Sequence, residues 1–280
     1  MMPHGGAPSD SATQSVLTAE RVRLLSFNIQ VGINTARYRH YLTRSWQHLL
    51  PSAARADNLQ RIGELLGDYD LVALQEVDGG SLRSGYLNQV EHLASLAGFP
   101  YWYQQLNRNL GPLAQHSNGV LSRICPDRVE KHALPGPRGR GAMLLEFGQG
   151  PQALAVVVMH LALGARVRAR QLSYIRELVS GYRHQVLMGD MNTHATDLLE
   201  HSPLRHMGLV APQVQATFPS WHPQKCLDHI LLSPSLALEK VEVLPLSISD
   251  HLPVAVEIRL PSDVRRSLET KALALRAEDR

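Results

Sequence analysis

Short apolar segments, each ending in a polar residue, constrain the fold of this chain more than any other feature. Their length and their content of valine, isoleucine and leucine favour β-strands over helices. The strands that we expect are Val22–Phe27, Leu71–Leu74, Gly119–Leu121, Met143–Phe147, Leu154–Met159, Gln185–Met188, Leu227–Leu232 and Val254–Ile258. Several are apolar almost throughout, which is typical of strands buried on both faces beneath covering helices.

Amphipathic segments between these strands predict helices. We expect a helix at Asp57–Leu66 capped by Asp57, one at Leu87–Ala97 ending at Gly98, and one at Ala165–Val179. No helix is expected between the strands from residue 119 to residue 160, so the pattern lacks strict strand–helix alternation. This favours a mixed sheet or two sheets, with helices packed outside.

The composition is that of a folded protein with one large core. Of 280 residues, 44% are hydrophobic and 19% are charged, which excludes global disorder. Residues 1–20 are rich in Gly, Pro, Ser and Thr and predict a flexible leader. We expect a single catalytic domain at residues 21–260. The charged residues 261–280 carry apolar side chains at helical spacing and predict a helical tail.

Charge and cysteine content set expectations for partners and compartment. Lys and Arg number 28 against 25 Asp and Glu, a net charge of +3 that suits an anionic partner without demanding one. Cys125 and Cys226 are too far apart for a zinc knuckle and too few for a disulfide framework. There is no run of about 18 apolar residues and no signal-peptide pattern at the start. We therefore expect a cytoplasmic monomer without a transmembrane segment.

Polar side chains stand where the expected strands end. They are Asn28, Glu76, His160, Asp190, Asn192, Asp228, Asp250 and His251. If the strands are neighbours, these side chains converge on one crevice. Carboxylate and amide oxygens without thiolates suit Mg²⁺ or Mn²⁺. With histidines added, the set is equipped to hydrolyse a phosphate ester.

Each of these residues also has an ordinary structural interpretation. The segment from Gly189 to Asn192 could form an Asx turn, and His160 could be a satisfied core histidine. Asp228 is harder to explain in this way, because a buried carboxylate is costly unless it has a partner such as His251. The whole set of residues therefore indicates a phosphate-ester hydrolase more specifically than any single residue does.

Short segments around these polar residues, taken in their order along the chain, resemble the endonuclease/exonuclease/phosphatase superfamily. This superfamily includes DNase I-like nucleases, abasic-site nucleases, sphingomyelinases and inositol polyphosphate phosphatases. The matching segments are Ser26–Asn28, Leu74–Val77, Ser117–Arg123, His160–Leu161, Gly189–Asn192, Leu227–Ile230 and Ser249–His251. They span nearly the whole chain and are most similar to compact bacterial members. The resemblance implies a four-layer α/β sandwich, with two mixed β-sheets face to face and helices on the outside.

The resemblance also implies the residues that bind metal and substrate. Glu76 would be the principal ligand of Mg²⁺ (or Mn²⁺), with Asn28 beside it and Asp250 completing the metal environment. Whether one or two ions act stays open. Asn118 and Arg140 align with substrate-contacting positions, although a solvated loop is the alternative for Arg140.

The catalytic roles implied by the resemblance fall on the remaining residues. Asp190 would orient or activate the attacking water, and Asn192 would hold the scissile phosphate. His160 would donate to a phosphoryl oxygen. Asp228 would orient His251, which would act as acid, base or charge stabiliser. Whether Asp190 or His251 is the base stays open.

These residues indicate a divalent-metal-dependent phosphoester hydrolase. We expect a phosphodiesterase that uses in-line attack of an activated water on nucleic acid, a nucleotide or a phospholipid headgroup. The alternatives are a phosphomonoesterase acting on a sugar or inositol phosphate, and a catalytically silent binding scaffold. Cys226 stands where many relatives have arginine, with Lys225 displaced by one, and this puts a phosphate or structural contact in doubt.

Partners beyond the phosphate-ester substrate are less well indicated. Arginines alternate on one helix face, at Arg166, Arg168 and Arg170, but the sequence has no long basic insertion, so charge does not indicate nucleic acid. The segment 37–48 interleaves basic residues with Tyr38, Tyr41 and Trp46. It could stack bases, rest peripherally on a lipid headgroup region, or simply pack.

Overall fold

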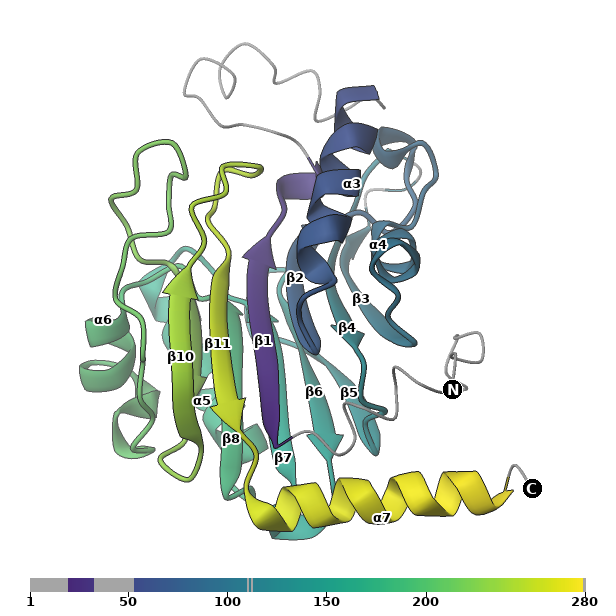
Figure 1. Ribbon diagram of the computed structural model, residues 1–280. Coiled ribbons are helices and arrows are strands. Elements are labelled where there is room, and N and C mark those ends of the chain that lie inside the picture. The colour runs from purple at the N-terminus through teal and green to yellow at the C-terminus, as the bar shows by residue number, and fades with distance from the viewer. Residues whose placement is uncertain (1–19, 33–52, 110, 112, 279–280) are drawn as a thin grey trace.

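A computed structural model describes residues 20–32, 53–109, 111 and 113–278 of the chain (Figure 1). The predicted leader lies outside these residues except for Glu20, and the segment 37–48 lies outside them entirely. Of the helices in the described part, none is long and apolar enough to cross a membrane.

Two mixed β-sheets form the centre of the molecule. The first has six strands in the order β10–β11–β1–β2–β4–β3, and the second has five in the order β5–β6–β7–β8–β9. The pairs β1–β2 and β7–β8 are parallel, and the other neighbouring pairs of described strands are antiparallel. The strands are β1 (Arg21–Asn28), β2 (Leu71–Val77), β3 (Tyr101–Asn109), β4 (Gln115–Ser122), β5 (Arg128–Ala133), β6 (Gly141–Phe147), β7 (Leu154–His160), β8 (His184–Asp190), β9 (Asp228–Leu232), β10 (Ala237–Val243) and β11 (Val254–Arg259).

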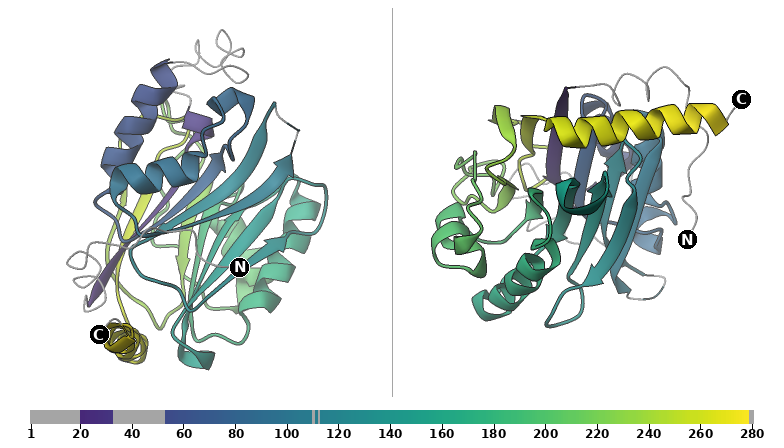
Figure 2. Two further views of the ribbon diagram at one scale, coloured as in Figure 1. Left: turned by 90° about the vertical axis from the view of Figure 1, so that its right-hand side faces the viewer. Right: turned by 90° about the horizontal axis from the view of Figure 1, so that it is seen from below.

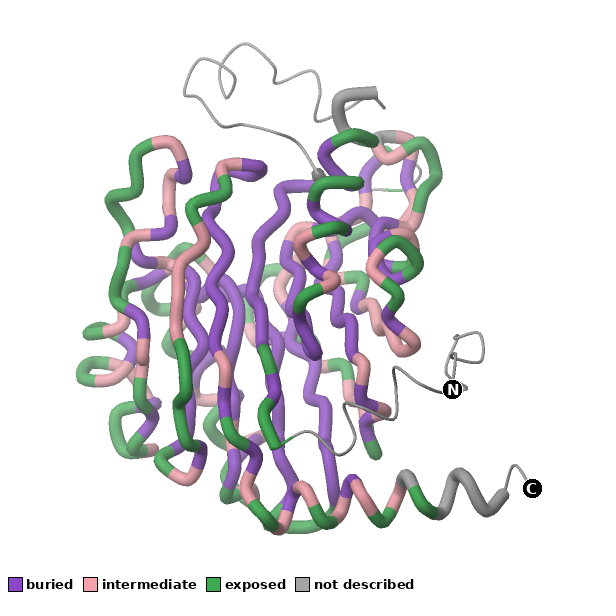
Figure 3. The backbone as a smooth tube through the Cα atoms, in the orientation of Figure 1, coloured by how far each residue is buried: buried purple, intermediate pink, exposed green. Residues whose placement is uncertain are grey.

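Three apolar clusters hold four layers together. The central cluster joins the facing sheets through side chains such as Leu24 of β1 and Val158 of β7. A second cluster packs α3 (Ala53–Leu66) and α4 (Gln89–Ala97) on the first sheet, and a third packs α5 (Ala165–Val179) and α6 (Ala195–Glu200) on the second. Figure 2 shows α3 and α4 on the opposite outer side from α5, and Figure 3 shows the inner strands of the sheets buried for most of their length. The expected four-layer sandwich is confirmed.

The C-terminal helix α7 (Ser262–Glu278) crosses one end of the sandwich (Figures 1 and 2). Val264 and Leu268 are each 1% exposed and join the central cluster. Near its start, Asp263 Oδ2 lies 3.2 Å from His184 Nε2 of β8. The short 3₁₀ helices η1 (Gln30–Gly32), η3 (Leu82–Ser84), η4 (Gly150–Gln152) and η5 (Pro203–His206) complete the described helices.

The strands that the sequence did not predict, β3, β5 and β10, all lie at sheet edges. Each has many half-buried or exposed residues, so the continuous apolar signal of an inner strand is missing. Two helix starts also differ. Helix α3 begins before Asp57, which is therefore not its cap, and α4 begins at Gln89, capped by Asn88, whose side chain accepts from the backbone N–H of Val90.

Candidate active site

The ends of the inner strands meet where the two sheets face each other. Asn28 ends β1 in the first sheet, and Asp190 ends β8 in the second. Asn28 Nδ2 donates to Asp190 Oδ2 at 3.2 Å and to Glu76 Oε1 at 3.4 Å. One buried amide thus bridges the sheets and joins two of the predicted carboxylates.

His160 lies beside Asp190 because parallel strands β7 and β8 pair these two residues. His160 Nε2 is 3.3 Å from Asp190 Oδ2. Burial alone would raise the pKa of Asp190. The hydrogen bond and the attraction of His160, the attraction of His251 and the backbone N–H of Asn192 outweigh burial, so the pKa lies below its usual range. Asp190 is therefore held as an ionised carboxylate.

Asp228 and His251 form a second acid–histidine pair, next to Asp190 and His160. Asp228 begins β9 opposite Asp190 and is fully buried, and its Oδ2 accepts from His251 Nδ1 at 2.8 Å. The ring of His251 packs against Phe218, with ring centroids 4.8 Å apart. Burial alone would lower the pKa of His251, but the charge and hydrogen bond of Asp228 raise it to about 10. His251 is therefore cationic near neutral pH in this arrangement.

The carboxylates of the two pairs are close enough to share one cation. Among the described residues, Asp190, Asp228 and His251 each offer a ligand atom within 4.8 Å of the others. Asp228 Oδ1 is buried without a hydrogen-bond partner. His251 Nδ1 already donates to Asp228, so Nε2 is the ring nitrogen that this histidine could offer to an ion without losing that bond.

Asp250 and Asn192 are held next to the same group of residues by short-range hydrogen bonds. Ser249 Oγ donates to Asn28 O at 2.7 Å and lies 3.3 Å from Asp250 Oδ1. Burial raises the pKa of Asp250 to about 6, with the Glu76 carboxylate adding to the rise and His251 opposing it. The backbone N–H of Asn192 donates to Asp190 Oδ1 at 3.0 Å, which is the geometry of an Asx turn.

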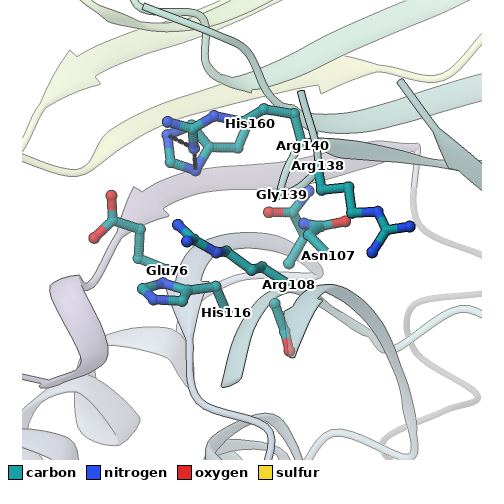
Figure 4. A pocket seen from close by; sticks show the side chains of 10 residues that line it. Glu76, Asn107, Arg108, His116, Arg138, Gly139, Arg140 and His160 are labelled. Atoms are coloured by element: carbon teal, nitrogen blue, oxygen red, sulfur yellow. Dashed lines mark hydrogen bonds between the residues drawn. The ribbon is translucent and has the colours of Figure 1, made fainter. Parts of the chain in front are cut away.

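Arg140 and Asn118 both line a pocket next to the site, and Figure 4 shows Arg140 beside His160. Arg140 Nη1 is 2.7 Å from each ring nitrogen of His160. The guanidinium of Arg140 therefore lies against the imidazole ring, whose Nε2 is also 3.3 Å from Asp190 Oδ2. Burial lowers the pKa of Arg140. Asn118 Nδ2 donates to Gly141 O at 3.0 Å, and its Oδ1 is buried without a hydrogen-bond partner.

The structure adds residues that the sequence did not indicate. Thr217 Oγ1 donates to Asp228 Oδ2 at 2.5 Å and so supports the Asp228–His251 pair. A lone Thr before Phe-Pro carries no pattern by which it could have been found. Cys226 is buried and bonded to Gln213, and burial raises the pKa of its thiol to about 11. Burial and this contact place the Cys226 side chain inside the fold, with its thiol protonated near neutral pH.

Comparisons with known proteins identify the family of this chain and its fold. The sequence profile of the Endonuclease/Exonuclease/phosphatase family matches residues 25–251. No curated protein matches the chain. The crystal structure of an endonuclease/exonuclease/phosphatase from Beutenbergia cavernae is similar with a TM-score of 0.65 and 19% identity, covering 86% of this chain and 72% of that one.

Two other solved structures share the fold. A mannosyl-6-phosphatase from Bacteroides thetaiotaomicron has a TM-score of 0.62 and 15% identity, covering 85% of this chain and all of that one. TDP2 from D. rerio, solved with a single-strand DNA product, has a TM-score of 0.61 and 14% identity, covering 86% of this chain and 100% of that one. At these identities the likeness establishes the fold alone.

Proposed function

Because the chain belongs to the endonuclease/exonuclease/phosphatase family, whose members hydrolyse phosphate esters, we propose that it is a divalent-metal-dependent phosphodiesterase. One observation carries this proposal. The buried amide of Asn28 links Glu76 to Asp190 across the two sheets, and the Asp228–His251 pair lies beside them. Acid, amide and imidazole groups thus stand in one cluster, a combination suited to phosphoester hydrolysis.

The side chains present fit Mg²⁺ (or Mn²⁺). We propose that Glu76, Asn28 and Asp250 hold the ion, because their donors are hard oxygens and no thiolate lies among them. Burial raises the pKa of Asp250 and the Glu76 carboxylate adds to the rise, so a cation held between these two carboxylates would stabilise their ionised forms. When bound, the ion supplies charge neutralisation at the phosphoryl oxygens.

The chain's own residues then position the reactants. Asp190 accepts hydrogen bonds from Asn28, His160 and the backbone of Asn192, which fixes its carboxylate to orient the attacking water. Asp228 holds the Nδ1 proton of His251, so Nε2 is the atom left to face the substrate and stabilise negative charge on it. Asn192 and His160 are proposed to hold the remaining phosphoryl oxygens. To do so, Asn192 exchanges the bond from its Nδ2 to Leu161 O, and His160 exchanges its contact with Asp190, for the phosphate.

The test compares variants of the site with matched surface variants. Glu76→Gln and His251→Ala should each reduce Mg²⁺-dependent hydrolysis of bis(p-nitrophenyl) phosphate by about 100-fold or more, because each removes a group acting in the transition state. Glu64→Gln on the exposed face of α3 and the exposed His206→Ala should leave the rate unchanged. Thermal melts by circular dichroism check that all four variants fold. Wild-type rates in both site variants would contradict the proposal.

A substrate panel separates the candidate activities. The panel contains plasmid, single-stranded DNA, an abasic duplex, phospholipid vesicles and phosphomonoesters, since the neighbouring structures include both a DNA product complex and a sugar phosphatase. Release of inorganic phosphate from monoesters, with every diester untouched, would replace the phosphodiesterase with a phosphomonoesterase. The absence of Mg²⁺ and Mn²⁺ binding by calorimetry would instead favour a silent scaffold.

A further inference from the structure

A pocket beside the site is lined only in part by side chains that the proposed mechanism uses. Glu76 and His160 belong to that mechanism, and Asn118 and Arg140 lie with them in the lining. The remaining lining residues have no role in it: Asn107 and Arg108 from β3, His116 and Ser117 from β4, and Arg138 with Gly139 from the segment between β5 and β6. The pocket therefore spans both sheets and opens next to the proposed phosphate position.

Positive charge exceeds negative charge along this pocket. Glu76 is the one carboxylate among its lining residues, and it is the proposed metal ligand. Within the described ranges, neither Arg108 nor Arg138 makes an ion pair, whereas Arg259 pairs with Glu239 at 2.8 Å. An unpaired guanidinium at the mouth of an active site is suited to a phosphate, which it can bind with two parallel hydrogen bonds.

The strand register directs Arg108 into the pocket. Arg108 lies directly opposite His116 in the antiparallel β3–β4 pair, so both side chains are on the same face of the sheet. The Cδ atom of Arg108 is 3.5 Å from the position that a Cβ on Gly139 would take, so its aliphatic part rests on the segment that carries Arg140. Figure 4 shows Arg108 extending toward His116 and Glu76, while Arg138 turns away from them.

We propose that Arg108, with His116 beside it, binds a second phosphate of the substrate that is not itself cleaved. This inference rests on the proposed phosphoester hydrolysis and specifies its substrate class. The enzyme would prefer a phosphoester carrying a further phosphate, either the next phosphate of a nucleotide strand or the second phosphate of a small bisphosphate.

Kinetics on matched substrates test the preference. The dinucleotide TpT is compared with pTpT and TpTp, and fructose 6-phosphate is compared with fructose 1,6-bisphosphate. In at least one of these two comparisons, the kcat/KM of the wild type should be about tenfold higher for the compound that carries the extra phosphate. Arg108→Ala should abolish that preference. Arg108→Lys should keep part of it. Arg166→Ala, on the exposed face of α5, should leave it intact.

Binding measurements separate this inference from the proposed function. Calorimetry with Ca²⁺ and the same compounds should give tighter binding of the member with the extra phosphate to the wild type, but not to Arg108→Ala. If that difference is found while no compound is hydrolysed, the subsite stands and the proposed hydrolysis fails. Equal affinity within every pair, or a preference that survives in Arg108→Ala, overturns the subsite whatever the rates.

Discussion

Gly189 precedes Asp190 in β8 and admits no side chain. Its φ is +142°, and a Cβ built on it would lie 1.9 Å from the carbonyl oxygen of Met159 and 2.9 Å from the carbonyl carbon. These are backbone atoms of the neighbouring parallel strand, so no rotation of a side chain can relieve the overlap. Replacing Gly189 with alanine must therefore separate β7 from β8 at the pair that adjoins His160 and Asp190.

The magnitude follows from two costs. A φ that L-residues rarely adopt costs about 1–3 kcal/mol, and forcing a methyl group into a packed interior costs about 1–3 kcal/mol more. We expect Gly189→Ala to lower the free energy of unfolding by about 2–6 kcal/mol, out of the roughly 5–15 kcal/mol that holds a typical domain folded. Any protein that remains folded should hydrolyse phosphodiesters poorly, because the 3.3 Å contact of His160 with Asp190 is displaced.

Urea denaturation followed by circular dichroism, together with the diesterase assay, measures both effects. Gly181→Ala is the matched control, because its Cβ would meet nothing within 4 Å. A Gly189→Ala protein whose unfolding free energy lies within about 0.5 kcal/mol of the wild type would refute the reasoning.

Three further predictions concern metal, charge and the C-terminal helix. Mg²⁺ should raise the melting temperature of the wild type by relieving repulsion among the site carboxylates, and Glu76→Gln should abolish that rise. An equal rise in the wild type and in Glu76→Gln would count against Glu76 as a metal ligand. Because the folded pKa of His251, about 10, exceeds its ordinary 6.5, the unfolding free energy measured in EDTA should fall as pH rises between these values, by an amount on the order of a few kcal/mol. Asp228→Asn should remove this fall, and a fall of the same size in that variant would contradict the assignment. Asp263→Asn should weaken the docking of α7 through His184, seen as faster hydrogen exchange in that helix, and unchanged exchange would exclude the contact.

The inner strands and the polar residues at their ends could be predicted because each leaves a local trace. A strand covered on both faces needs nearly continuous apolar residues, and β1, β7 and β8 have them. The strands β3, β5 and β10 could not be predicted because each lies at the edge of its sheet. One edge and part of one face of each of these strands contact water, so polar residues are tolerated there and no continuous apolar run marks the strand. The start of α3 was misplaced because Asp57 fits the composition of a cap but lies inside the helix.

The candidate site was predictable as a set of residues but not as a set of contacts. Asn28, Glu76, Asp190 and His160 could be chosen because a polar residue directly after a buried strand needs a partner or a function. The supporting Thr217 and the pocket residue Arg108 could not, because threonine in a loop and arginine on an edge strand are ordinary residues there. Their roles depend on what faces them in space.

The sequence by itself determined which segments become buried strands and which polar groups must lie at their ends, because burial and strand period act on neighbouring residues. Only the tertiary structure decided that the amide of Asn28 in one sheet reaches the carboxylate of Asp190 in the other, and that Arg108 faces the same pocket as Glu76. Such contacts depend on strand register and on how two sheets lie against each other. Both are set by the packing of the whole core, which no local pattern records.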